Sequence, residues 1–175
     1  MSERSRLLLN AGLFQLGWFA CVLGAHRPWL LLIAMACLAA HLLWIAKGFD
    51  EWCILLRVAA CGWVVDSALM HFGLLHFSRV AIVLPLWLAI LWLLFASTLH
   101  HSLRWTKQPW WLGSLAGALG GPLSYWGGAR MADVGLPLDI WPSMLLLAVI
   151  WALLMPALHW MAGPTQGCLR KNKVI

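Results

Sequence analysis

The sequence has little charge, and it is especially poor in acidic residues. Charged residues make up 10% of its 175 residues, with 6 acidic against 12 basic side chains. An ordinary soluble domain is about 25% charged. Because 63% of the residues are also hydrophobic, the composition indicates lipid as the solvent. The basic residues lie at the ends of apolar segments, which favours membrane topology over a nucleic-acid role. No nucleic-acid partner is therefore predicted.

The chain also lacks the motifs of the common membrane enzymes. Its five cysteines form no C-x-x-C pair, and its seven histidines do not form the boxes of di-iron desaturases. There is no H-E-x-x-H zinc motif, no G-x-S-x-G elbow and no dinucleotide fingerprint. We therefore predict no metal and no cofactor. A bis-histidine haem between helices stays open, because four histidines are expected at similar depth: His41, His100, His101 and His159.

Six apolar segments can be drawn, each near the ~20 residues that a helix needs to cross a bilayer. They cover residues 7–25, 28–46, 53–77, 80–99, 111–128 and 140–161. The links between them are short and leave no room for a soluble domain. The sequence predicts an all-α fold, a polytopic membrane protein with a bundle of six transmembrane helices. Residues 1–175 then form a single integral-membrane domain.

The basic residues predict the orientation of these segments. With a cytoplasmic N-terminus, nine of the lysines and arginines fall on the inner side and three on the outer side. The positive-inside rule then places both termini in the cytoplasm, and we expect a multi-pass protein of the bacterial inner membrane. Tryptophans at segment ends should mark the two interfaces. These are Trp44, Trp52, Trp105, Trp110, Trp111 and Trp160 inside, and Trp29, Trp126 and Trp141 outside.

Asp66 lies near the middle of the segment 53–77. A carboxylate at that depth costs on the order of 2.5–3.5 kcal/mol, so it needs a partner. The candidates on neighbouring helices are Asn10, Gln15, Ser124 and Tyr125. Two interpretations stay open. Asp66 is either a buried carboxyl that fixes helix register, or an acid that handles a proton or binds a substrate.

The segment 111–128 is rich in small residues. Gly113, Gly117 and Gly121 repeat at four-residue spacing, and so do Ala116, Gly120, Ser124 and Gly128. Small residues let helices approach closely. The two small faces predict contacts on both sides of this helix, and therefore a position at the centre of the bundle.

Polar residues gather where the fourth segment ends, at His100, His101 and Arg104, and we expect Arg57 and His159 at the same depth. Guanidinium and imidazole groups can donate to phosphate oxygens. These residues therefore predict a site for anionic phospholipid headgroups, and the alternative is an interfacial anchor with no ligand. Asn10 and Tyr125 complete the set of candidate binding residues.

Three stretches carry a resemblance to a known family: GWVVDSALMHFGLLHF, PLWLAILWLLFASTLHHSLRW and GALGGPLSYWGGARM. Over nearly its whole length the chain resembles an uncharacterised proteobacterial inner-membrane protein family, the domain of unknown function DUF2878. The resemblance implies a small polytopic membrane protein with no assigned activity. Genes of that family often lie near those for cyclopropanation or oxidation of membrane fatty acyl chains, which implies a lipid-related role.

The expected function is therefore that of a lipid-interacting membrane protein, accessory to the modification of membrane fatty acyl chains. One alternative is an integral-membrane lipid-modifying enzyme with Asp66 and His71 as catalytic acid–base groups. Another is a small proton-coupled carrier, although no inverted repeat relates the two halves of the chain. Whether the protein is an enzyme is left undecided. Membrane lipids are the expected partners, and a second membrane protein or another copy of the chain stays open.

Overall fold

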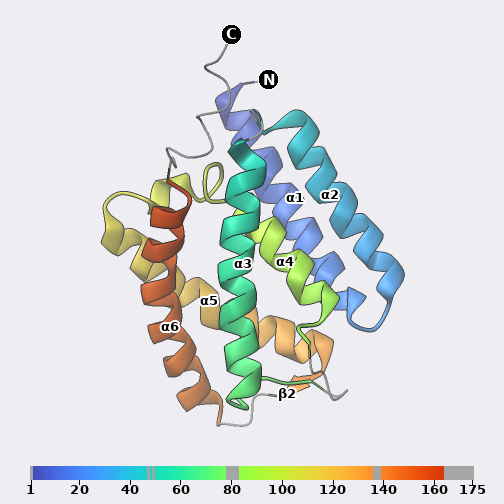
Figure 1. Cartoon of the computed structure of the whole chain (residues 1–175), viewed down its shortest axis with the longest axis vertical. Coiled ribbons are helices and arrows are strands. Elements are labelled where there is room, and N and C mark those ends of the chain that lie inside the picture. Colours follow the sequence, from blue (N-terminus) through green and yellow to red (C-terminus); the bar gives the residue numbers. More distant parts are fainter. Residues whose placement is uncertain (1, 47, 49, 78–82, 136–138, 164–175) are drawn as a thin grey trace.

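Each of the six predicted segments contains a helix in the computed structural model, which describes residues 2–46, 48, 50–77, 83–135 and 139–163. The helices are α1 (Glu3–Gly24), α2 (Leu31–Trp44), α3 (Asp50–His71), α4 (Leu86–Ala96), α5 (Trp110–Ala132) and α6 (Ile140–Met161). Two 3-10 helices, η1 (Pro28–Leu30) and η2 (Arg104–Thr106), precede α2 and α5. Figure 1 shows that α1 begins and α6 ends toward the same end of the bundle.

Several helix ends have identifiable causes in the sequence. At the start of α1 the Ser2 hydroxyl accepts a hydrogen bond from the Ser5 amide at 3.1 Å, as an N-cap residue does. At the end of α5, Asp133 adopts a left-handed conformation with φ of 52°. The strand β2 (Val134–Gly135) follows and pairs antiparallel with β1 (His76–Phe77). This pairing joins the segments after α3 and α5 at the opposite end of the bundle from the start of α1 (Figure 1).

Three of the described helices, α1, α3 and α6, are long and apolar enough to cross a membrane, at 22 residues each. The fourth predicted span is wrong as drawn. α4 begins only at Leu86 and has 11 residues, which extend about 16 Å at 1.5 Å per residue. That is roughly half of the hydrocarbon core. Turns follow α4, and residues 80–82 of the predicted span lie outside the described residues.

The third predicted span also ends earlier than expected. α3 stops at His71, and Gly73 takes a left-handed backbone with φ of 70° that ends the helix. The residues up to Phe77 then form a turn and β1. The described residues thus form six α-helices, of which three have the length and composition of a membrane span.

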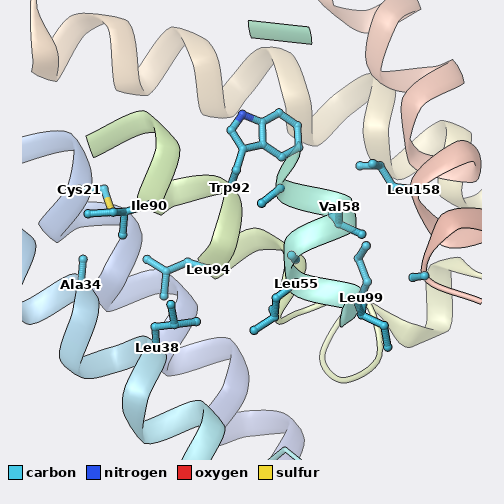
Figure 2. Close-up of a cluster of buried hydrophobic side chains, with 14 of the residues drawn as sticks. Cys21, Ala34, Leu38, Leu55, Val58, Ile90, Trp92, Leu94, Leu99 and Leu158 are labelled. Carbon is cyan, nitrogen blue, oxygen red and sulfur yellow. The ribbon is translucent and has the colours of Figure 1, made fainter. Parts of the chain in front are cut away.

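α4 occupies the position that the sequence assigned to the glycine-rich helix. It packs against α1, α2 and α3, and its buried residues are Leu88, Ile90, Trp92, Leu94 and Ala96. Figure 2 labels Ile90, Trp92 and Leu94 within the apolar core. α5 instead packs mainly on α6 and leaves Leu115, Leu119 and Leu123 exposed. The predicted central position of α5 is therefore wrong.

The outer surface of the bundle is apolar on the long helices. Leu8 on α1, Val64 on α3 and Leu153 on α6 are each 70% or more exposed. Soluble monomers rarely expose large contiguous apolar patches. The apolar exterior therefore supports the conclusion, already suggested by the lengths of α1, α3 and α6, that this is a membrane protein.

Candidate functional site

Asp66 lies at the junction of three helices and is fully buried. The indole Nε1 of Trp92 on α4 donates to Asp66 Oδ2 at 2.6 Å. The hydroxyl of Tyr125 on α5 donates to Asp66 Oδ1. Among the described residues, no lysine, arginine or histidine forms an ion pair with this carboxyl. Asp66 therefore links α3 to α4 and α5 through two neutral donors.

The hydrogen bonds to Asp66 differ in what they allow. Indole nitrogen can only donate, so Asp66 Oδ2 is an acceptor whatever the protonation state of the carboxyl. A phenol can both donate and accept, so Tyr125 can donate to an ionised Asp66 or accept from a protonated one. The arrangement can hold one exchangeable proton without changing the heavy-atom contacts.

Two glycines make room for the aromatic rings beside Asp66. A Cβ on Gly62 would come within 2.0 Å of the Trp92 ring, and one on Gly121 within 2.2 Å of the Trp151 ring. The two indoles stack between these helices, with centroids 5.5 Å apart and an interplanar angle of 4°. Gly62 precedes Asp66 by one helical turn on α3, so Trp92 can lie across the helix and reach the carboxyl.

The structure separates the other residues that were predicted to act with Asp66. His71 is exposed at the end of α3, where its ring contacts Phe72 at 5.6 Å between centroids. Arg57 donates from Nε to the Cys53 carbonyl at 3.1 Å, within its own helix. The carboxyl of Asp66 and the imidazole of His71 do not form a shared acid–base pair.

A cavity of about 380 Å³ lies beside Trp151 of the aromatic stack, between α1 and α5. Its lining is mostly apolar and comes from α1, α4, α5 and α6, together with Leu103. Gln15, Gly120 and Leu123 belong to the lining and are exposed. The cavity therefore opens onto the outer surface between α1 and α5.

The two small-residue faces of α5 have different roles. Gly117 packs against α6, since a Cβ there would lie 2.3 Å from the Trp151 carbonyl oxygen. Gly120 has nothing within 4 Å of a Cβ position and lines the cavity instead. The prediction that both faces contact helices is confirmed by Gly117 on one face and by Gly128, near Val22 of α1, on the other, whereas Gly120 faces the cavity. At the cavity edge, Trp18 Nε1 donates to the Ser124 hydroxyl at 3.0 Å.

A second buried polar cluster lies toward the end where α1 begins. The Nε2 atoms of His41 and His101 lie 3.3 and 3.2 Å from the same oxygen of Glu51. His41 is also 3.2 Å from the side-chain nitrogen of Asn10, which sequence analysis offered as a partner of Asp66. The two imidazoles contact edge to face, with centroids 5.0 Å apart, and both turn Nε2 toward Glu51. They are therefore not placed to ligate opposite faces of a haem.

The predicted headgroup residues divide among different partners. His101 contacts Glu51. Arg104 lies 3.8 Å from Glu3, and the side chains of Arg104 and Glu3 are both largely exposed. Burial lowers the pKa of His100, which favours its neutral form. His159 bonds through Nε2 to the Thr106 hydroxyl at 2.7 Å. Each of these residues therefore interacts with a different group of the protein.

Sequence reasoning missed Glu51, Trp92 and Trp151 as site residues. The sequence analysis assigned no role to any of the three. No local spacing links Glu51 to His41 and His101, which are 10 and 50 residues away. The four-residue step from Gly62 to Asp66 on α3 is the one local signal for the Trp92 contact.

Comparison with known proteins gives one match. The family model described as "Protein of unknown function (DUF2878)" matches residues 7–157. No curated protein and no solved structure matches the chain.

Proposed function

The chain belongs to the DUF2878 family, described as proteins of unknown function, and we propose that it is a membrane protein that binds the acyl chain of a membrane lipid. The acyl chain of the lipid would lie in the cavity between α1 and α5. The observation that carries this proposal is the cavity itself, about 380 Å³ in volume, mostly apolar and open on the outer surface. In the same proposal the six helices form one integral-membrane unit with both termini in the cytoplasm.

The chemistry of the lining favours an acyl chain over a polar ligand. Phe14, Phe95, Trp151 and Met155 contribute apolar walls, and burial of apolar surface is the dominant favourable term for a hydrocarbon ligand. Gly120 leaves the wall open on the α5 side. The polar side chains of the lining are few, chiefly Gln15 and Ser124. The Ser124 hydroxyl already accepts a hydrogen bond from Trp18.

The geometry supports the other candidate functions less well. Both oxygens of Asp66 are engaged by Trp92 and Tyr125, and Asp66 is not part of the cavity lining. This weighs against acid–base chemistry on a lipid in the cavity. The predicted headgroup site is weakened by Glu51, whose carboxylate lies beside His101 and would repel a phosphate. We therefore propose that the protein recognises the acyl chain of the lipid. Any modification of that acyl chain is then carried out by a partner protein.

The experiment compares lipid bound to three purified proteins. Gly120→Leu places a side chain in the cavity, and its Cβ meets no atom of the other described segments within 4 Å. Gly12→Leu is the matched control, since Gly12 is equally open but lies on the exposed face of α1. Lipids retained through detergent purification are extracted and quantified by mass spectrometry. We expect wild type and Gly12→Leu to retain the same lipid, and Gly120→Leu to lose most of it.

Thermal unfolding in detergent checks that all three proteins are folded. Leucine favours a helix over glycine by up to about 1 kcal/mol, so neither variant should be less stable than wild type. Equal lipid retention by wild type and Gly120→Leu would overturn the proposal. The proposal would also be overturned if the lipids bound to all three proteins had the same composition as the membrane, because a specific cavity binds some lipids in preference to others.

A further inference from the structure

The cluster of His41, Glu51 and His101 supports a second site, independent of the lipid cavity. Its residues come from the end of α2, the start of α3 and the turns after α4. The side chains of His41 and Glu51 are 1% and 9% exposed, whereas that of His101 is 16% exposed. Two imidazoles and one carboxylate thus meet at a buried point that solvent reaches beside His101.

The spacing of the three side chains is that of metal ligands. One ligand atom from each residue lies within 4.8 Å of the others. Zinc bonds nitrogen and oxygen at about 2.0–2.2 Å in tetrahedral geometry, which separates neighbouring ligand atoms by about 3.3 Å. The two separations between histidine Nε2 and Glu51 Oε1 are 3.3 and 3.2 Å. Both contacts are also within hydrogen-bonding distance, so each imidazole can donate to Glu51 when no ion is bound.

We propose that His41, Glu51 and His101 bind a divalent transition-metal ion such as Zn²⁺. Imidazole and carboxylate are the ligand types that zinc takes, and three protein ligands leave one position for water. Glu51 supplies one negative charge to the ion. The site joins α2, α3 and the segment after α4, so an ion there cross-links three parts of the bundle.

The hydrogen bonds of Asn10 weaken metal binding at this site. Its Oδ1 accepts from the backbone amide and hydroxyl of Ser102, and its Nδ2 donates to the Ser97 carbonyl. The amide is therefore held with Nδ2 facing His41 Nδ1 at 3.2 Å, and the neutral ring carries its proton on Nε2. Metal at Nε2 requires that proton to move to Nδ1, where ligating histidines usually meet an acceptor. Because Asn10 offers a donor there, binding is weaker than at a structural zinc site.

The test is a titration of the purified full chain in detergent with Co²⁺, followed by visible absorption. We expect one saturable equivalent in wild type, with the intense bands of a four-coordinate ion. His100→Gln is the matched control, because His100 is next to His101 in the chain but lies outside the cluster. Glu51→Gln and His101→Gln should each weaken binding by about tenfold or more, a loss of about 1.4 kcal/mol.

A second readout guards against misfolding. Zn²⁺ should raise the thermal midpoint of wild type and His100→Gln, since a ligand that binds only the folded state stabilises it. If Glu51→Gln does not fold, the partly exposed His101→Gln variant carries the comparison. Absence of saturable Co²⁺ binding in wild type overturns the site. Equal loss of binding in His100→Gln and His101→Gln overturns it as well.

Discussion

At the scale of single residues, Asp66 gains its partners from neutral donors. Trp92 and Tyr125 together occupy both of its oxygens. Sequence analysis identified the need for a partner from hydropathy alone, and it named Tyr125 among four candidates. It could not name Trp92, because an indole inside an apolar helix is indistinguishable in sequence from a residue that only packs.

The Asp66 contacts predict different outcomes for two substitutions. Asp66→Asn can accept from Trp92 through its oxygen and donate to the Tyr125 hydroxyl through its nitrogen, so its stability should stay near that of wild type. Asp66→Leu leaves the Trp92 N–H buried without an acceptor and should lose about 1–3 kcal/mol. Unfolding of both variants in detergent measures the difference.

The same pair of variants bears on the alternative functions of Asp66. Asparagine cannot exchange a proton, so a proton-coupled carrier would lose its cellular activity in Asp66→Asn while remaining folded. A carboxyl that only sets helix register would keep that activity. Equal destabilisation by asparagine and leucine would show that the charge, and not the hydrogen bonds, holds α3 in place.

At the scale of elements, α5 illustrates how a repeat of small residues can be read in two ways. Gly113, Gly117 and Gly121 contact other parts of the protein closely, while Gly120 faces open space. The four-residue spacing predicts that each set shares a face. It cannot tell whether a second helix or a cavity lies against that face, because this depends on how far α1 and α5 diverge.

We predict that Gly117→Leu destabilises the contact between α5 and α6. A Cβ at this position would lie 2.3 Å from the backbone oxygen of Trp151, which cannot turn aside as a flexible side chain would. Overpacking of this kind costs about 1–3 kcal/mol. Thermal unfolding in detergent, with Gly120→Leu as the control at an open position, measures the effect. A Gly117→Leu variant as stable as Gly120→Leu would contradict the close packing of the two helices.

At the scale of the whole molecule, most tryptophans are either buried or exposed, and Trp18, Trp63 and Trp87 are half-buried. Trp92 and Trp151 are in the core, whereas the nine tryptophans expected at the interfaces are all exposed: Trp29, Trp44, Trp52, Trp105, Trp110, Trp111, Trp126, Trp141 and Trp160. Exposed tryptophan near helix ends is typical of membrane interfaces. The exposures are compatible with the predicted belt and with a molecule surrounded by lipid.

We predict that Lys107 lies on the cytoplasmic side and Asp133 on the periplasmic side. α5 lies between these two residues, and the excess of basic residues places its start inside. Reporter fusions that end at Lys107 should therefore be active only as cytoplasmic reporters, and fusions that end at Asp133 only as periplasmic ones. Reversed activities at both positions would invert the proposed orientation, and the same compartment at both would show that α5 does not cross.

By itself the sequence indicated a lipid environment, an all-α fold and six helical segments, because hydropathy and charge are properties of consecutive residues. It overestimated the length of the fourth helix, since apolar composition does not show where Pro85 starts a helix or where turns follow Ala96. Only the tertiary structure decided which helix is central, what binds Asp66, and that Glu51 meets His41 and His101. These contacts depend on the angles and separations at which helices cross, and no single segment of the chain contains that information.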